Sequence, residues 1–134
     1  MEYICGVTFA PFACAGAFFK PGARESLAMM KERTGANFVI FVPGGLQETP
    51  QSEEICFTSK ATMEDDELIE MIKYAKETGL RVALKPTVNC KNGTWRAHIN
   101  FFDEDVPCEP KWGNWFASYT AFQLHYAKIA EAYG

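Results

Sequence analysis

Residues 81–96, with the sequence RVALKPTVNCKNGTWR, decide how the rest of this chain is interpreted. The first five residues are typical of a buried strand, and Pro86, which cannot donate to a sheet ladder, is expected to end it. The stretch gathers cations, amides and an indole within a few residues: Lys85, Thr87, Asn89, Asn92, Trp95 and Arg96. Cations and amides donate hydrogen bonds and an indole stacks on flat faces, so this stretch predicts a site for a sugar or a phosphate.

Two earlier segments have the composition of strands in a parallel sheet. Residues 3–9 (YICGVTF) and 37–42 (NFVIFV) are nearly continuous apolar runs, which is typical of strands covered on both faces. The proline and glycines at 43–45 are expected to end the second strand. A helical pattern follows each strand, and we expect helices at residues 23–34, from 62 to 78 and from about 112 to 133.

The expected helices have recognisable inner faces and ends. In the first helix, Leu27, Met29 and Met30 are expected to face inward, and Gly35 is expected to terminate it. In the second, Thr62 is expected to cap the helix, with Asp65 completing a capping box. The inner stripes of the second and third helices are expected to be Leu68, Ile72 and Ala75, and Trp112, Trp115, Phe116, Tyr119, Phe122, Tyr126 and Ile129.

The predicted order is strand, helix, strand, helix, strand, helix, in a single domain spanning residues 1–134. Each connection has room for a right-handed crossover, so we expect parallel strands and an α/β fold class. Two architectures remain open: a small open α/β sheet, or part of a (β/α)₈ barrel. In both, functional side chains lie at the C-terminal ends of the strands, which is where the polar stretch after residue 85 begins.

The composition argues against several classes of partner. The chain of 134 residues is 48% hydrophobic with a net charge of -4, and its lysines and arginines are scattered singly. We therefore expect no nucleic-acid partner, since that class needs a basic surface. We also expect no membrane partner, because no apolar run is long enough to span a bilayer and the N-terminal apolar stretch lacks a basic start. Five cysteines without a C-x-x-C pair are typical of free thiols in a reducing compartment, which favours a cytoplasmic protein.

No cofactor and no metal site is predicted. The sequence has no G-x-G-x-x-G or P-loop motif, and residues 43–45 lie too far from the next helix to hold a phosphate at its N-terminus. His98 and His125 are far apart, and neither lies in a cluster of metal ligands. We expect His125 to be a packing residue between the last helix and the sheet, with a satisfied nitrogen. His98 lies in the polar loop, and its role is open.

No catalytic residue is predicted from spacing. Hydrolysis of a glycosidic bond needs two carboxyl groups, about 5–5.5 Å apart in a retaining enzyme. The acidic residues fall into one helix start and two loops, and none lies at a strand end beside a partner. Trp95 and Arg96 have two interpretations. Either the indole stacks on a sugar while the guanidinium binds hydroxyls, or Trp95 anchors the loop and Arg96 pairs with Asp103 or Glu104.

Several short motifs follow one another along the chain. They are Gly6-Val7-Thr8-Phe9, Gln47, Gly79-Leu80-Arg81-Val82 leading into Lys85-Pro86, Gly93-Thr94-Trp95-Arg96, Trp115-Phe116-x-x-Tyr119, and His125-Tyr126-Ala127. In this order and with these spacings they resemble glycoside hydrolase family 113, the β-mannanase-type members of a clan of (β/α)₈ barrels. The resemblance covers nearly the whole chain. It implies retaining hydrolysis of β-1,4-mannosidic bonds in mannan-type oligosaccharides, through two glutamates at the ends of barrel strands four and seven.

The resemblance also implies which residues of this chain bind the substrate. Lys85, Asn89, Trp95 and Arg96 fall where family members line the sugar site. Many relatives have His and Asp in place of Thr87 and Asn89, so this chain departs from the pattern at those two positions. Neither catalytic glutamate has a counterpart here, because the fourth strand would follow residue 134.

Chain length limits the functional prediction. A full (β/α)₈ barrel takes about 250 residues. The 134 residues therefore correspond to three βα units of eight, an incomplete barrel. We expect a truncated N-terminal part of a mannanase-like glycoside hydrolase that is inactive alone, with an oligosaccharide as its partner. The alternatives are a non-catalytic carbohydrate-binding module, which could self-associate through exposed strand edges, and an unrelated small α/β domain that acts through a reactive cysteine.

Overall fold

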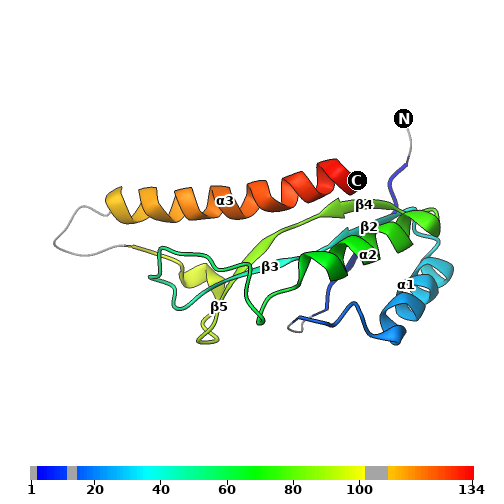
Figure 1. Ribbon diagram of the computed structural model, residues 1–134, viewed down its shortest axis with the longest axis horizontal. Helices are drawn as coiled ribbons and strands as arrows, with labels where there is room; N and C mark the ends of the chain where they lie inside the picture. Colours follow the sequence, from blue (N-terminus) through cyan, green and yellow to red (C-terminus); the bar gives the residue numbers. More distant parts are fainter. Residues whose placement is uncertain (1–2, 12–14, 102–108) are drawn as a thin grey trace.

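The computed structural model describes residues 3–11, 15–101 and 109–134. Within these ranges, parallel strands alternate with helices in one α/β unit (Figure 1). In chain order the elements are β1 (Gly6–Phe9), α1 (Pro21–Thr34), β2 (Phe38–Phe41), β3 (Gly44–Gln47), α2 (Asp65–Glu77), β4 (Arg81–Leu84), β5 (Thr87–Cys90), the short 3₁₀ helix η1 (Arg96–His98) and α3 (Glu109–Tyr133).

The strands form a parallel sheet in the order β1-β2-β4, and β3 and β5 pair beyond it. The ladder runs on between the two parts, because the Lys85 amide donates to the Phe41 carbonyl (2.8 Å) and the Thr87 amide to the Pro43 carbonyl (3.0 Å). β3 and β5 therefore prolong β2 and β4. β2 and β4 end at Phe41 and Leu84, before Pro43 and Pro86, as predicted, but the strands β3 and β5 that follow directly were not predicted. Successive residues of a strand face opposite edges, so the missing amide hydrogen of Pro86 falls on the edge away from β2.

Residues along the central strand alternate between two faces of the sheet with different burial. We call the covered face the one that carries Val39, Phe41, Pro43, Gly45 and Gln47, all of which are buried. We call the open face the one that carries Phe38, Ile40, Val42, Gly44 and Leu46, all of which are partly exposed. Strand register places Thr8 and Ala83 beside Ile40 on the open face. Within the described residues, the expectation of strands covered on both faces therefore holds for one face only.

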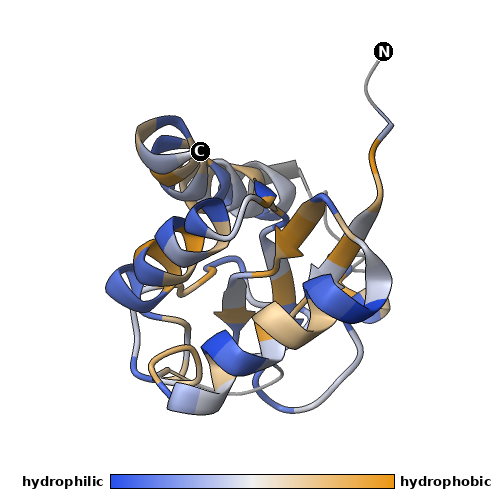
Figure 2. Ribbon diagram, turned by 90° about the vertical axis from the view of Figure 1, so that its right-hand side faces the viewer, coloured by the Kyte–Doolittle hydropathy of each residue, from blue (hydrophilic) through white to orange (hydrophobic). Residues whose placement is uncertain are grey.

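The helices complete the core over the covered face. α2 and α3 lie side by side, and each contacts β4 (Figure 2). Their buried side chains are Leu68, Met71, Ile72 and Ala75 of α2 and Phe122, Tyr126 and Ile129 of α3, and α1 adds Leu27. Two predicted core residues are wrong: Met29 is 47% exposed and Phe116 is 55% exposed. Each lies well around its helix from the buried stripe.

The start of α2 differs from the prediction. The helix begins at Asp65, after Glu64, and not at Thr62. The hydroxyl of Thr62 is used in the preceding turn, where it donates to the Ser59 carbonyl (2.8 Å) and accepts from the Ser59 amide (3.1 Å). The capping interaction comes from Glu67, whose carboxylate accepts the Glu64 amide at 2.9 Å. The end of α1 is as predicted, because Gly35 adopts a left-handed φ of 66° there.

Candidate functional site

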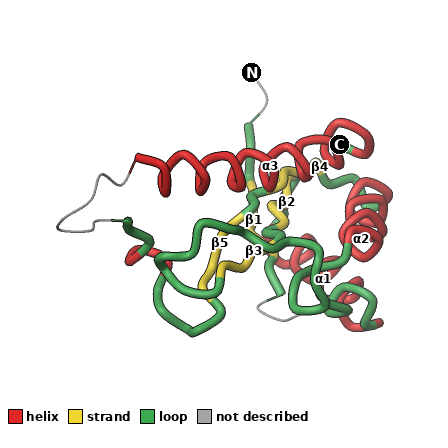
Figure 3. The backbone as a smooth tube through the Cα atoms, turned by 60° about the vertical axis from the view of Figure 1, so that its left-hand side comes forward, coloured by secondary structure: helices red, strands yellow, loops and turns green. Residues whose placement is uncertain are grey.

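A cavity of about 280 Å³ lies where β3 and β5 end. Figure 3 shows β3 and β5 side by side. Three segments enclose the cavity: the residues after β1, the last part of the β3–α2 loop, and the region from β5 to η1. Its lining residues are Ala10, Pro11, Val42, Gly44, Leu46, Ala61, Thr62, Met63, Thr87, Asn89 and Arg96. The site therefore lies at the C-terminal ends of the strands, as expected for this fold class.

Strand pairing explains why polar side chains reach this cavity. In β5, Thr87 and Asn89 are two residues apart and share the open face. Their register partners in β3 are Gly44 and Leu46, which form the floor beside them. Because Gly44 has no side chain, the floor leaves open space next to Thr87.

Two of the four predicted substrate-binding residues line the cavity, and two do not. Asn89 and Arg96 contribute to its wall. Lys85 is exposed before β5 and does not line the cavity. Trp95 is 69% exposed, and its ring makes an edge contact with His98, with 6.2 Å between ring centroids. The indole is therefore largely exposed and is not a buried loop anchor. The alternative partners predicted for Arg96, Asp103 and Glu104, lie outside the described residues.

The long loop between β3 and α2 is fixed to α3 and forms one wall. Gln47, which is buried, accepts a hydrogen bond from the Trp115 indole at 3.0 Å. The Ile55 amide donates to the Ser118 hydroxyl at 2.9 Å, and the Asn114 amide group donates to Glu53 at 2.6 Å. These bonds connect positions far apart in sequence, so the wall depends on the packing of α3 as much as on the loop itself. Its last residues, 61–63, reach the cavity.

Glu67 is a buried carboxylate that sequence reasoning missed. It is 1% exposed, although it lies in the acidic first turn of α2. Oε1 accepts the amides of Gly16 (3.0 Å) and Glu64 (2.9 Å), and Oε2 accepts the amide of Phe18 (3.0 Å). Hydrogen bonds to a charged group contribute about 1.5–3 kcal/mol each, so Glu67 holds two loops against the start of α2. Only the capping-box spacing from Glu64 could have indicated this role.

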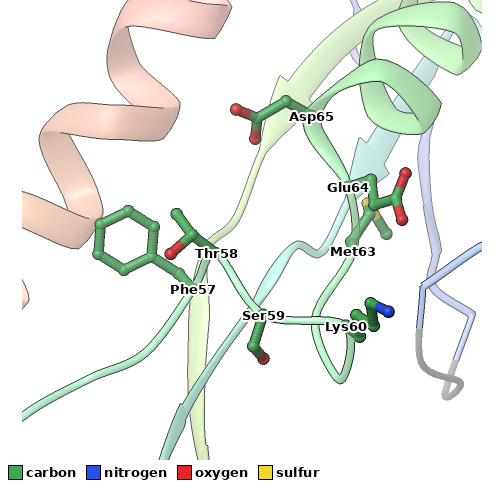
Figure 4. A pocket seen from close by; sticks show the side chains of 7 residues that line it. All are labelled: Phe57, Thr58, Ser59, Lys60, Met63, Glu64 and Asp65. Carbon is green, nitrogen blue, oxygen red and sulfur yellow. The ribbon is translucent and has the colours of Figure 1, made fainter.

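His125 has a satisfied nitrogen, as predicted, but its partners differ from the expected sheet. Its Nε2 lies 2.8 Å from Asp65 Oδ1, and its ring packs beside Phe57 with centroids 5.2 Å apart. A second cavity of about 310 Å³ adjoins this contact. In Figure 4, Asp65 points toward α3, whereas Glu64 and Lys60 point the other way. The charged groups of the second cavity do not converge, so it offers no acid–base pair and no common ligand position.

The remaining candidate chemical groups have ordinary structural roles. Cys5, Cys56 and Cys90 are free thiols, and burial raises the pKa of the Cys90 thiol, which disfavours a reactive thiolate. At the cavity end of the sheet, Lys91 Nζ lies 2.5 Å from a Glu48 carboxylate oxygen. This hydrogen bond raises the pKa of Lys91. In the described part of the chain, no three His, Cys, Asp or Glu side chains are grouped closely enough to hold a metal ion.

The model of Glycoside Hydrolase Family 113 matches residues 7–134. The chain belongs to glycoside hydrolase family 113. A solved structure of a GH113 β-1,4-mannanase complex shares 55% sequence identity with this family 113 chain, with a TM-score of 0.87. The GH113 β-mannanase AaManA from Alicyclobacillus acidocaldarius, solved in complex with ManMIm, shares 38% identity with a TM-score of 0.85.

These matches cover this chain and its relatives unequally. They include 97% of this family 113 chain, but only 42% of the first relative and 41% of AaManA. The match confirms both the resemblance to the family and the prediction of an incomplete (β/α)₈ barrel. No curated protein matched the sequence. Among the described residues, no helix combines the length and apolar character needed to cross a membrane.

Proposed function

We propose that this chain supplies the first three βα units of a retaining glycoside hydrolase that acts on β-1,4-mannan-type oligosaccharides. The observation that carries the proposal is the cavity at the ends of β3 and β5, in a chain that is 55% identical to a GH113 β-1,4-mannanase. Carbohydrate sites in barrels are built from the loops at this end of the strands.

Four side chains are proposed to hold the sugar. Asn89 and Arg96 line the cavity, where an amide and a guanidinium can bind hydroxyl groups in fixed directions. Trp95, next in the chain to Arg96, presents an exposed ring that can stack on the flat face of a sugar. Lys85 is exposed and lies two residues before Thr87 in the chain. It is proposed to bind a sugar unit further along the oligosaccharide.

The two catalytic glutamates are proposed to lie outside residues 1–134. No carboxylate lines the cavity among the described residues. Glu67 and Asp65 are held by amides and by His125, and Glu48 pairs with Lys91. Because a retaining mechanism needs two carboxyl groups at the scissile bond, we expect no hydrolysis by the isolated chain.

A second candidate function is a non-catalytic carbohydrate-binding or self-associating α/β module. The partly exposed open face and the edges of β1 and β4, which pair with no further strand among the described residues, favour association. Light scattering of the purified chain distinguishes the two candidates. If the chain is a self-associating module, it should form a stable dimer or larger assembly. If it is part of an enzyme, it should form no assembly of defined stoichiometry.

Binding and hydrolysis can be measured on the same protein. By isothermal titration, mannohexaose should bind the wild-type chain, and Trp95→Ala should weaken binding by about tenfold or more. Phe116→Ala is the matched control, because Phe116 is an exposed aromatic residue on α3 that does not line the cavity. Reducing-sugar release from mannan should not exceed that of a heat-denatured sample. Release well above that level would contradict the proposed location of the catalytic pair.

The coding sequence after residue 134 gives an independent test. The proposed function predicts an apolar strand ending in a glutamate within about the next dozen residues, as barrel loop lengths place it. A stop codon directly after Gly134 would favour the module instead.

A further inference from the structure

Glu67 connects two loops that border the cavity, and we propose that it is a positioning residue that sets the shape of the sugar-binding wall. It does not line the cavity itself. The inference rests on the proposed function for the identity of the ligand, but the loop contacts on which it depends can be tested without any ligand.

The first connection runs from Glu67 to the end of β1. Oε2 accepts the Phe18 amide at 3.0 Å, which fixes the backbone position from which the Phe18 ring projects. That ring stacks on Phe9 with centroids 6.0 Å apart, and it meets Phe41 edge-on at 5.4 Å. Phe9 is the last residue of β1, and the next residue, Ala10, lines the cavity. Moving Phe18 would therefore move one wall.

The second connection runs from Glu67 to the loop before α2. Oε1 accepts the Glu64 amide at 2.9 Å, and Met63, directly before Glu64, lines the cavity. The same oxygen accepts the Gly16 amide at 3.0 Å. One carboxylate thus joins the chain segment after β1 to the segment before α2.

The chemistry explains why a carboxylate is needed at this position. Three amide hydrogens converge on two oxygens, and a carboxylate has acceptor sites for all of them. A glutamine of the same size has one acceptor oxygen and a donor group. If its oxygen occupies the Oε1 position, Gly16 and Glu64 keep their bonds while the amide group of the glutamine faces the Phe18 amide. Glu67→Gln should therefore release Phe18 while preserving the size of the side chain.

Hydrogen exchange measures the connection directly. In Glu67→Gln, the Phe18 amide should exchange at least about tenfold faster, whereas the amide of Val39 in β2 should be unchanged. Glu70→Gln is the matched control, because Glu70 lies one turn later on α2, is exposed, and pairs with Arg24. Unchanged exchange at Phe18, Gly16 and Glu64 in Glu67→Gln would overturn the inference.

Sugar affinity then separates positioning from general stability. Glu67→Gln should weaken mannohexaose binding by about fivefold or more. Ile72→Val lowers stability within the buried stripe of α2 and leaves the Glu67 carboxylate in place, so it should leave the affinity unchanged. Equal weakening in both variants, or unchanged affinity in Glu67→Gln, would overturn the positioning role. Absence of binding by the wild-type chain would contradict the proposed function, and hydrogen exchange would still decide the role of Glu67.

A second variant covers the case in which Glu67→Gln does not fold. Phe18→Leu keeps the backbone amide on Glu67 and removes the ring that stacks on Phe9. We expect weaker mannohexaose binding with an intact fold by circular dichroism. Wild-type affinity in Phe18→Leu would show that this path does not position the wall.

Discussion

The covered face and the open face of the sheet belong to the same strands but are completed in different ways. On the covered face, Val39 and Phe41 have no exposed surface and pack beneath the three helices. On the open face, Phe38 and Ile40 keep part of their surface exposed. The core of this chain is therefore complete on one side only, and the cavity with Asn89 and Arg96 belongs to the incomplete side.

This difference separates stability from function within each strand. Alternate residues point to opposite faces, so neighbouring positions serve different purposes. Substitutions on the covered face should change folding, whereas those on the open face should change ligand binding or association with further structure. Matched substitutions on the two faces of one strand can test the separation.

The largest expected difference is between two phenylalanines of β2. Phe41→Ala should lower the free energy of unfolding by about 3–5 kcal/mol, because it leaves a cavity in a fully buried site. Phe38→Ala, on the open face, should cost about 1–2 kcal/mol. Urea denaturation followed by circular dichroism measures both values. Equal losses would show that the open face is also part of the folding core.

The next pair is two neighbouring glycines of β3. A Cβ at Gly45 would lie 2.6 Å from Ile55 Cγ2 and 3.0 Å from the Phe122 ring, so Gly45→Ala should cost about 1–3 kcal/mol through overpacking. A Cβ at Gly44 meets nothing within 4 Å, so Gly44→Ala should change stability by about 0.5 kcal/mol or less. Thermal unfolding of the two variants gives the comparison. A loss at Gly44 as large as that at Gly45 would contradict the assignment of faces.

A further effect is expected at Tyr126, whose buried hydroxyl has no hydrogen-bond partner among the described residues. Tyr126→Phe should therefore raise the free energy of unfolding by about 1 kcal/mol at neutral pH. Measurable destabilisation would indicate a partner for the hydroxyl, such as a bound water.

The same residue predicts a pH dependence. Burial, followed by the nearby Asp65 carboxylate, raises the pKa of Tyr126 above its ordinary value. Above the unfolded pKa of about 10, the unfolded chain loses the tyrosine proton while the native state keeps it. The stability contributed by this group is therefore fully present below that pH, and the free energy of unfolding falls as pH rises above it. Urea titrations from pH 8 to pH 11, a range of about three units around that pKa, should show a smaller alkaline loss of stability in Tyr126→Phe than in the wild type. An identical alkaline loss would contradict this assignment.

Local sequence patterns were sufficient for much of the fold. Apolar spacing predicted the α2 stripe of Leu68, Ile72 and Ala75, and glycine at position 35 predicted the end of α1. The pattern could not show that new strands, β3 and β5, follow directly after Pro43 and Pro86. That continuation depends on which edge of the sheet a missing amide hydrogen faces, and the edge is set by strand pairing.

For the candidate site, sequence reasoning could group residues that are close in the chain but not residues that are far apart. Asn89 and Arg96 lie close in sequence, and the structure places both at one cavity. Glu67 was not predicted, because its three donors include Gly16 and Phe18, which are about fifty positions away in the chain. Local sequence shows only an acidic helix start, whereas long-range folding makes the Glu67 side chain a buried acceptor.

The most direct test of the account is an NMR titration of the ¹⁵N-labelled chain with mannohexaose. We predict chemical-shift changes at the Asn89 side-chain amide, the Arg96 backbone amide and the Trp95 indole, all at the C-terminal ends of the strands. The amide of Val39 on the covered face should not change. Shifts confined to other surfaces, or no shifts with mannohexaose in large excess, would contradict the claim that this end of the sheet holds the sugar.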